Sequence, residues 1–221
     1  MKNFTRWIAC FAASMVLCGA SVLAVEEMPE QETQEVPASS YADISETDSF
    51  YDAVQYVSEN GLMSGVGGGR FAPDAHTDRA TLAVVLWRLA GEPVVNYAMR
   101  FSDVAEDMWY TEAVRWAASC GIVTGYDDVT FAPRDVLTRE QLCTMIYRYE
   151  QYMGGGFSGA WMFLLAYPDA AEISEWAYEA VCWLSMHQVT APTDAPLLPK
   201  GGVPRGELAQ MLALYAQIAS R

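Results

Sequence analysis

The chain has 221 residues and a formal net charge of −15 at neutral pH, because 28 aspartates and glutamates outnumber 13 lysines and arginines. Such an acidic surface argues against nucleic acid and anionic lipid headgroups as general partners, since both are negatively charged. An anionic ligand would have to be bound locally, by a few well-placed arginines.

Residues 1–24 have the layout of a secretory signal peptide. Lys2 and Arg6 precede an apolar run, and Val22-Leu23-Ala24 suits signal peptidase. The alternative is a retained membrane anchor, but the run is short and diluted by small residues. Cleavage after Ala24 would remove two cations and lower the net charge from −15 to −17. We therefore expect a secreted protein with no membrane insertion after signal cleavage.

Residues 25–40, "VEEMPEQETQEVPASS", contain five glutamates, two prolines and no cation. This composition is typical of an acidic disordered linker. The remaining chain, about 180 residues, is long enough to bury a substantial core as one compact unit.

Beyond residue 40 one pattern occurs three times, and we assign the copies to residues 41–96, 97–160 and 161–221. Each copy opens with an aromatic residue two places before an aspartate: Tyr41 and Asp43, Phe101 and Asp103, Tyr167 and Asp169. A stretch with apolar residues at helical spacing follows, marked by the pairs Ala53-Val54, Ala113-Val114 and Ala180-Val181. In the first copy, Phe50-Tyr51 stands where the second has Trp109-Tyr110. Internal repetition of this kind indicates one supersecondary unit used three times.

In the first two copies this helix is predicted to end at a glycine. Gly61 and Gly121 fit a helix C-terminus, where a left-handed residue is common. Gly65 and Gly125 follow four residues later as loop glycines, whereas the third copy reads "HQVTAP" at 187–192.

The stretches "FAPDAHTDRATL" (71–82) and "FAPRDVLTREQL" (131–142) open a second helix. Thr138 and Gln141 form a capping-box pattern, Asp78 fills the cap position in the first copy, and Pro204 stands there in the third. Helices of about ten to fourteen residues are marginal alone in water, so their apolar faces must pack together. We predict a mainly α fold in which three helix-loop-helix copies form a pseudo-threefold helical bundle, with three similar grooves between copies.

Arg79, Arg139 and Arg205 lie in the first turn of the second helix, the end at which the helix dipole disfavours a cation. A helix N-terminus with free amides, together with a guanidinium, can bind a carboxylate or phosphate. The alternative is that each arginine pairs with an acidic neighbour, most plausibly Asp43, Asp103 or Asp169. Both can hold if the aspartate orients an arginine that still faces a groove.

Residues 101–148 resemble an S-layer homology (SLH) repeat over its full length. The resemblance rests on Phe-x-Asp-Val, Trp-Tyr-x-x-Ala-Val, Gly-Ile-x-x-Gly, Phe-x-Pro and Thr-Arg-Glu, in that order. The first copy matches well, with Asp78-Arg79-Ala80 in place of Thr-Arg-Glu. The third, degenerate copy keeps the helices and Arg205 but lacks the loop glycines and the Phe.

The resemblance implies a non-catalytic anchoring module at the bacterial cell wall or S-layer. Its partner would be a secondary cell wall polymer linked to peptidoglycan, often bearing a pyruvylated amino sugar. In that family the arginine of the Thr-Arg-Ala-Glu motif contacts the acidic sugar. Arg79 and Arg139 match this motif, whereas Arg205 matches in position only. Further candidate ligand-binding residues are Trp109, which could equally be a core residue, Gly125, Tyr126 and Asp127.

Arg205 lies between Pro204 and Gly206, and this departure from the motif predicts that the three copies differ in affinity for the wall polymer. We expect the first two to bind wall polymer better than the third. Replacing Arg139 by alanine should then weaken wall binding more than replacing Arg205.

Two other functions are alternatives to wall anchoring. Catalysis is disfavoured because His76 and His187 are the only histidines, and no nucleophile pattern, P-loop, zinc motif or EF-hand spacing accompanies them. We expect no cofactor and no metal site, and we interpret Cys120, Cys143 and Cys182 as small core residues.

The second alternative is a protein-interaction module or envelope adaptor that keeps the fold without binding sugar, with another envelope protein as partner. The apolar cluster Trp161–Leu165 favours it if exposed. The cluster could instead cover the bundle.

Overall fold

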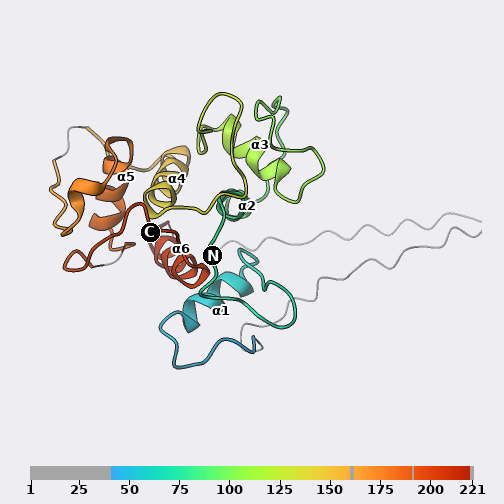
Figure 1. The fold of residues 1–221 in the computed structure, drawn as a ribbon. Helices are drawn as coiled ribbons and strands as arrows, with labels where there is room; N and C mark the ends of the chain where they lie inside the picture. Colours follow the sequence, from blue (N-terminus) through green and yellow to red (C-terminus); the bar gives the residue numbers. More distant parts are fainter. Residues whose placement is uncertain (1–40, 160–161, 191, 220–221) are drawn as a thin grey trace, which may run out of the picture. The chain divides into compact units, whose positions relative to one another are not determined.

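The computed structural model describes residues 41–159, 162–190 and 192–219, all within one compact unit that spans residues 35–221. The predicted signal peptide and acidic linker lie outside the described residues. Within the described residues the structure is helical, with isolated β-bridges and no strand (Figure 1), so the prediction of a mainly α fold is confirmed. The elements are α1 (Tyr51–Glu59), α2 (Arg79–Leu89), α3 (Thr111–Ser119), α4 (Arg139–Tyr152), the short 3-10 helix η2 (Ala170–Glu172), α5 (Glu175–Met186) and α6 (Arg205–Ala219).

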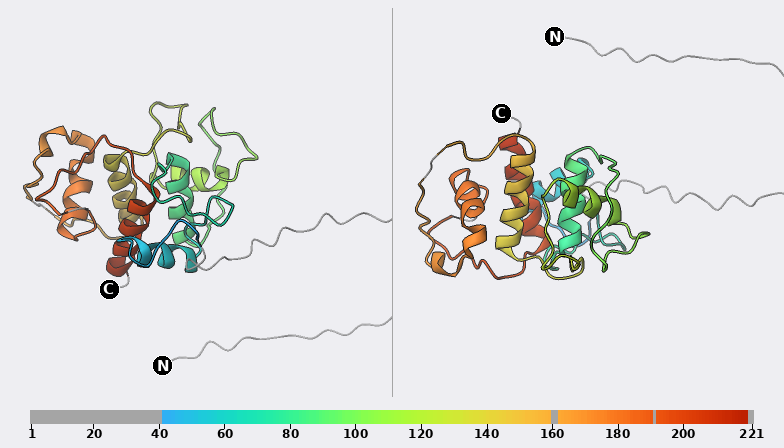
Figure 2. Two further views of the ribbon diagram at one scale, coloured as in Figure 1. Left: turned by 60° about the horizontal axis from the view of Figure 1, so that its bottom comes forward. Right: turned by 90° about the horizontal axis from the view of Figure 1, so that it is seen from above.

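The helices pair between copies and not within them. Helix α3 of the second copy packs on α2 of the first, α5 of the third packs on α4 of the second, and α1 of the first packs on α6 of the third. Helices α2, α4 and α6 lie next to one another and run roughly parallel, with α1, α3 and α5 outside them (Figures 1 and 2). This exchange of partners closes the three copies into a ring.

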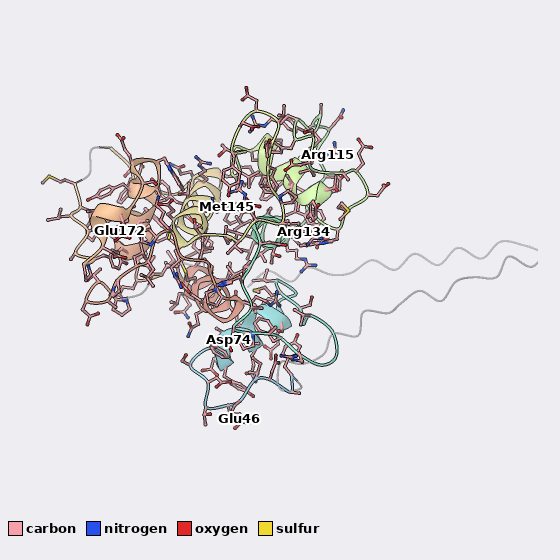
Figure 3. The ribbon with its side chains drawn as sticks, viewed as in Figure 1. Glu46, Asp74, Arg115, Arg134, Met145 and Glu172 are labelled. Atoms are coloured by element: carbon pink, nitrogen blue, oxygen red, sulfur yellow. The ribbon has the colours of Figure 1, made fainter. Side chains whose placement is uncertain are left out.

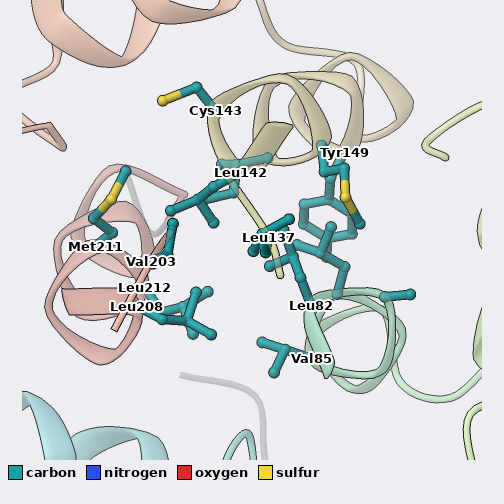
Figure 4. Packing of buried hydrophobic residues seen from close by; sticks show 14 of the residues in the cluster. Leu82, Val85, Leu137, Leu142, Cys143, Tyr149, Val203, Leu208, Met211 and Leu212 are labelled. Carbon is teal, nitrogen blue, oxygen red and sulfur yellow. The ribbon is translucent and has the colours of Figure 1, made fainter. Parts of the chain in front are cut away.

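The core lies where α2, α4 and α6 meet. Leu82, Leu142 and Leu208 occupy the same position in their helices, three residues after the arginine, and all three are fully buried (Figure 4). One turn later Leu86, Ile146 and Leu212 are buried as well. The predicted apolar faces therefore do pack against one another, which stabilises helices too short to be stable alone.

A closed ring of backbone hydrogen bonds joins the segments that precede the central helices. The amide of Thr77 donates to the carbonyl of Val203 at 2.8 Å, Val203 donates to Leu137 at 2.9 Å, and Leu137 donates to Thr77 at 2.8 Å. Each copy therefore supplies the hydrogen-bond partner of a buried backbone amide in another copy, and a buried amide without a partner would cost free energy. This arrangement favours cooperative unfolding of the three copies as one unit.

An aspartate stabilises a strained turn in every copy. Asp43 accepts hydrogen bonds from the amides of Phe71 and Ala72, both at 2.8 Å. Asp103 and Asp169 bind the equivalent amides in their copies. The second residue of each turn is left-handed without being glycine: Ala72 (φ 57°), Ala132 (φ 56°) and Leu198 (φ 54°). That conformation costs about 1–2 kcal/mol, and the carboxylate offsets the cost.

The predicted helix ends are confirmed. Gly61 (φ 66°) and Gly121 (φ 73°) follow α1 and α3 in the left-handed conformation, and Gln188 (φ 58°) adopts it after α5. Thr138 and Gln141 form the capping box of α4, and Asp78 accepts a hydrogen bond from the amide of Thr81 at the start of α2. The third copy therefore keeps the turn although it lacks the glycine.

Among the described residues the three cysteines are free thiols, and two of them lie in the core. Cys143 and Cys182 are fully buried, and burial raises the pKa of Cys143 to about 12 and that of Cys182 to about 11. Cys120 is partly buried at the end of α3, so the interpretation as a core residue does not extend to it.

The apolar segment before α5, residues 162–165, is packed against the protein on one side and exposed on the other. Leu165 is buried and the carbonyl of Phe163 accepts a hydrogen bond from Tyr178, whereas Met162 is 98% and Leu164 is 85% exposed. Residue 161 lies outside the described part of the chain. The segment therefore covers α5 with one face and presents apolar side chains with the other. No described helix combines the length and the apolar character needed to cross a membrane.

Replacing Asp43 by alanine should lower the free energy of unfolding by about 1.5–3 kcal/mol, because two charge-assisted hydrogen bonds are lost and the turn at Ala72 is left unsupported. Urea unfolding at pH 7 measures the change. The matched control is Asp74→Ala, because Asp74 is an exposed aspartate of the same copy (Figure 3). A loss as large in the control would contradict the assigned role.

The effect of Asp43→Ala should also depend on pH. Burial raises the pKa of Asp43, but hydrogen bonds from the amides of Phe71 and Ala72 outweigh it, so the pKa is lowered on balance. A carboxylate with a lowered pKa stabilises the fold above its unfolded-state pKa, about 4, and this contribution is lost as the pH falls. The difference between the wild type and the variant should shrink below about pH 4.

Candidate functional site

The first amides of the central helices are not free. The amide of Arg79 donates to the carbonyl of Asp135 at 3.1 Å, and that of Ala80 donates to Pro133 at 3.0 Å. The same contacts recur at the starts of α4 and α6, with carbonyls of the following copy. The prediction of free amides at these helix ends is therefore wrong, because the threefold packing places each Phe-Ala-Pro turn against the next helix.

The Arg79 side chain joins the first copy to the second. Its Nε donates to the carbonyl of Phe131 at 2.9 Å, and one terminal nitrogen, Nη2, donates to Thr124 at 3.0 Å. The guanidinium lies 4.8 Å from the ring centre of Tyr126 and 4.7 Å from that of Phe131. Asp103 does not pair with it, because that carboxylate binds backbone amides. The alternative of an arginine–aspartate pair is thus wrong for Arg79.

The Arg79 charge is poorly hydrated. Burial lowers the pKa of the guanidinium, and nearby ionisable groups, Tyr126, Asp135 and Asp103, oppose this shift only in part. The group stays protonated at neutral pH, because arginine has a pKa above 12 in solution. Within the described residues no hydrogen-bond partner is found for Nη1. A desolvated cation with an unused donor attracts an anion strongly.

Arg205 makes the same two backbone contacts as Arg79 and lies against the equivalent phenylalanine, but among the described residues no second ring lies over it as Tyr126 lies over Arg79. Its Nε donates to the carbonyl of Phe71 at 2.8 Å, its Nη2 donates to Ser64 at 2.7 Å, and the guanidinium lies 4.7 Å from the Phe71 ring centre. The unusual residues on either side of Arg205 therefore do not change its placement.

Arg139 differs from both. Its Nε and Nη2 donate to the two carboxylate oxygens of Glu207, each at 2.6 Å, and Nη1 makes a long contact of 3.5 Å with the carbonyl of Leu198. Its charge is thus paired within the protein, as the alternative of an acidic neighbour expected, but the partner is Glu207 and not Asp169. Asp169 binds the amides of Leu197 and Leu198.

A groove of about 540 Å³ opens beside Arg79, and we call it the Arg79 groove. The first copy contributes Arg79 to its lining, and the third copy contributes Trp176 and Lys200. The second copy contributes residues 123–126 and one face of α4, which carries Met145 (labelled in Figure 3) and Arg148. Trp176 is 53% exposed and Tyr126 is 57% exposed. All three copies therefore build this one groove.

The Arg79 groove is cationic although the chain is acidic. Three cations, Arg79, Arg148 and Lys200, line it, together with one carboxylate, that of Glu140. Glu140 is buried and pairs with the Lys200 ammonium at 2.6 Å, and it also accepts hydrogen bonds from Ser174. Arg79 and Arg148 thus remain unpaired by lining carboxylates, and the Tyr126 ring lies against the Arg79 guanidinium.

A smaller groove of about 220 Å³, the Arg205 groove, has the same plan. It is lined by Arg205, residues 62–65, Arg88 of α2 and Trp109, and none of its lining residues is acidic. Trp109 is 52% exposed, so it is not a core residue. It lies in the groove of Arg205 and not in that of Arg139.

The third groove, the Arg139 groove, consists of two adjoining hollows along α6: one of about 210 Å³ that Arg139 lines, and one of about 780 Å³ that it does not line. Ser49 lines it where the other grooves have a tryptophan. Our alignment of Phe50 with Trp109 is therefore wrong by one position, since Phe50 precedes α1 as Tyr110 precedes α3.

The remaining predicted residues divide in two. Gly125 and Tyr126 line the Arg79 groove, and a β-carbon at Gly125 would lie 2.3 Å from the Asp127 carbonyl, so only glycine fits. Asp127 is not among the lining residues. Its carboxylate accepts hydrogen bonds from the amides of Val129 and Thr130, so it shapes the loop behind the groove.

Four groove residues escaped the sequence analysis: Arg148, Trp176, Lys200 and Glu207. The signal for Trp176 was present, because it precedes its Ala-Val pair by four residues, as Trp109 does. The others had no signal, since they reach a groove only through contacts between copies. Among the described residues, no cluster of histidine, cysteine and acidic side chains could hold a metal ion.

Comparison with known proteins agrees with this architecture. The S-layer homology domain model matches residues 40–83 and 100–143, which run from the turn-binding aspartate to the first turns of α2 and α4. The third helical pair lies outside the matched residues.

Similar curated proteins include three from bacteria. An amylopullulanase of Thermoanaerobacterium thermosulfurigenes is 26% identical over 73% of this chain and 9% of its own length. A cellulosome-anchoring protein of Acetivibrio thermocellus is 28% identical over 42% of this chain and 22% of its own. A surface-layer 125 kDa protein of Lysinibacillus sphaericus is 30% identical over 57% and 10%.

The chain thus spans at most about a fifth of the length of these relatives. The chain therefore belongs to the proteins that carry S-layer homology domains, with matched domains at residues 40–83 and 100–143.

Proposed function

We propose that residues 41–219 anchor the protein to the bacterial cell envelope by binding an anionic secondary cell wall polymer linked to peptidoglycan. The observation that carries this proposal is the cationic, aromatic-flanked Arg79 groove on a chain of net charge −15. The S-layer homology domains place the protein at the cell surface. The matched regions are anchoring modules and not catalytic domains, and the name of the cellulosome-anchoring relative fits this role.

The groove chemistry suits an acidic amino sugar, such as a pyruvylated one. The Arg79 guanidinium would bind the carboxylate through Nη1, and Arg148 or Lys200 would add a second cation. Trp176 and Tyr126 offer exposed aromatic rings against which the apolar face of a sugar ring can pack. A charge-assisted hydrogen bond contributes about 1.5–3 kcal/mol, so a few such contacts suffice to hold a polymer.

The grooves should differ in strength. We propose that the Arg79 groove binds the polymer most tightly, the Arg205 groove less tightly and the Arg139 groove least tightly. The Arg139 groove is ranked last because Glu207 forms an ion pair with Arg139 and because no tryptophan lines that groove. This order reverses the one expected from sequence, which ranked Arg139 above Arg205. We also propose that residues 161–221 form a third, diverged repeat, since Asp169 and Arg205 make the contacts of their counterparts.

A second candidate function is docking of another envelope protein. The exposure of Met162 and Leu164 on the segment before α5 favours it. This surface is distinct from the Arg79 groove residues, so the two functions can be separated by substitution.

Replacing Trp176 by alanine should weaken wall binding, because the Arg79 groove loses its largest exposed aromatic ring. We expect co-sedimentation with purified wall sacculi to fall about tenfold, the equivalent of roughly 1.4 kcal/mol. Arg79→Ala should reduce binding at least as much, but it also removes hydrogen bonds between copies. Trp176 is exposed, so its variant tests the groove without that complication.

The control is Arg139→Ala, which should retain most of the binding. Circular dichroism and thermal unfolding of each variant establish that the fold is intact. A larger loss with Arg139→Ala than with Trp176→Ala would overturn the proposed order of the grooves.

Wall binding should respond weakly to salt. The acidic chain and the anionic polymer repel each other at long range, while the groove cations attract at short range. Screening acts mainly on the long-range term, since the Debye length is about 8 Å at physiological ionic strength. Raising salt from about 20 to about 150 mM should leave sacculus co-sedimentation unchanged or slightly stronger. A steep loss would indicate broad electrostatic adhesion instead of groove binding.

A further inference from the structure

A second arginine lines each of the two cationic grooves. It lies nine residues after the first arginine of the central helix, at Arg88 in α2 and at Arg148 in α4. Nine residues are about two and a half helical turns, so this side chain leaves the helix on the side opposite the first arginine. Arg88 therefore lines the Arg205 groove, and Arg148 lines the Arg79 groove.

The third groove lacks a second arginine. The equivalent position in α6 holds Leu214, which is 40% exposed and lines the larger hollow of the Arg139 groove. The chain therefore has two grooves that each combine arginines from two copies, and one groove in which a leucine replaces the second arginine.

One residue holds both arginines of the Arg79 groove. The carbonyl of Thr124 accepts a hydrogen bond from Arg79 Nη2 at 3.0 Å, and the Thr124 hydroxyl accepts one from Arg148 Nη1 at 3.4 Å. Within the described residues this is the one side-chain hydrogen bond of Arg148, so most of its N–H donors are left for a ligand.

The Arg205 groove repeats this arrangement. The carbonyl of Ser64 accepts a hydrogen bond from Arg205 Nη2 at 2.7 Å, and the carbonyl of Leu62 accepts one from Arg88 Nη1 at 3.1 Å. In both grooves the loop after an outer helix therefore places two guanidinium groups from different copies next to each other.

The two further cations of the Arg79 groove differ in their partners. The Lys200 ammonium pairs with Glu140 at 2.6 Å, whereas Arg148 forms no ion pair within the described part of the chain. Burial lowers the pKa of the Arg148 guanidinium. The groove thus holds two partly desolvated guanidinium groups, of Arg79 and Arg148, with which no lining carboxylate pairs.

We propose that Arg148 and Arg88 are second anion-binding residues, so that each of these two grooves selects a ligand with two carboxylate groups. Two guanidinium groups can bind two carboxylates at once, whereas a ligand with one carboxylate leaves one guanidinium without an anion. The proposal rests on the proposed function and deepens it, because the wall polymer would present two carboxylates to one groove. The Arg139 groove, with Leu214, would lack this selectivity.

The test compares succinate, a dicarboxylate, with monomethyl succinate, which has the same carbon skeleton and one carboxylate. The readout is the Nε–H signal of Arg79 in nuclear magnetic resonance spectra of the whole chain, assigned by Arg79→Lys. Arg148→Leu installs the residue that α6 has at this position. Arg100→Leu is the matched control, because Arg100 is an exposed arginine that lines none of the three grooves.

In the wild type and in Arg100→Leu, succinate should shift the Arg79 signal at about a tenth of the concentration that monomethyl succinate needs, because it makes a second charge-assisted contact. In Arg148→Leu the two probes should need equal concentrations, with the folded spectrum preserved. Arg88→Leu should abolish the same preference at the Arg205 signal.

Arg148→Lys keeps the charge and should retain part of the preference for succinate, which a role in packing alone would not explain. Equal concentrations of the two probes in the wild type would overturn the proposal. So would an undiminished preference in a folded Arg148→Leu variant.

Sacculus co-sedimentation separates this proposal from the proposed function. If Arg148→Leu removes a preference for succinate but the wild type does not sediment with sacculi, the role of Arg148 is supported and wall binding fails. If the wild type and Arg148→Leu sediment equally and neither prefers succinate, wall binding is supported and the role of Arg148 fails.

Discussion

The structure depends on the ring of backbone hydrogen bonds through Thr77, Leu137 and Val203. Each of these residues donates to one copy and accepts from another, so no copy completes its own polar contacts. The ring brings the Phe-Ala-Pro turn of one copy against the first turn of the central helix in another. Every later feature follows from this exchange, including the pairing of helices between copies and the composition of the grooves.

The hydrogen bonds of Arg79 and Arg205 both stabilise the fold and position the guanidinium in a groove. Arg79 and Arg205 each donate two hydrogen bonds to carbonyls of the following copy, which holds neighbouring copies together. The same bonds fix the guanidinium beside a groove and desolvate it. An arginine at the unfavourable end of a helix dipole is therefore retained because the contacts between copies offset that cost.

Divergence between the copies has changed the grooves more than the fold. The third copy lacks the loop glycine and the Phe, yet Gln188 and Leu198 adopt the same left-handed conformations as their counterparts. By contrast, one carboxylate at Glu207 pairs with Arg139 and removes its charge from the groove. A backbone turn tolerates several residues when its hydrogen bonds persist, whereas an ion site depends on the sign of each nearby charge.

The sequence by itself determined the local structure: the helices, their glycine ends, the capping box at Thr138 and the buried apolar faces all follow from spacing within about ten residues. It also gave Arg79, Gly125 and Tyr126 as candidate ligand-binding residues, but it did not group them in one groove. Only the tertiary structure decided that α1 pairs with α6, that the helix amides are occupied, and that Arg139 binds Glu207 across 68 positions. These contacts join different copies, and repeat patterns specify each copy but not which face of one meets which residue of the next.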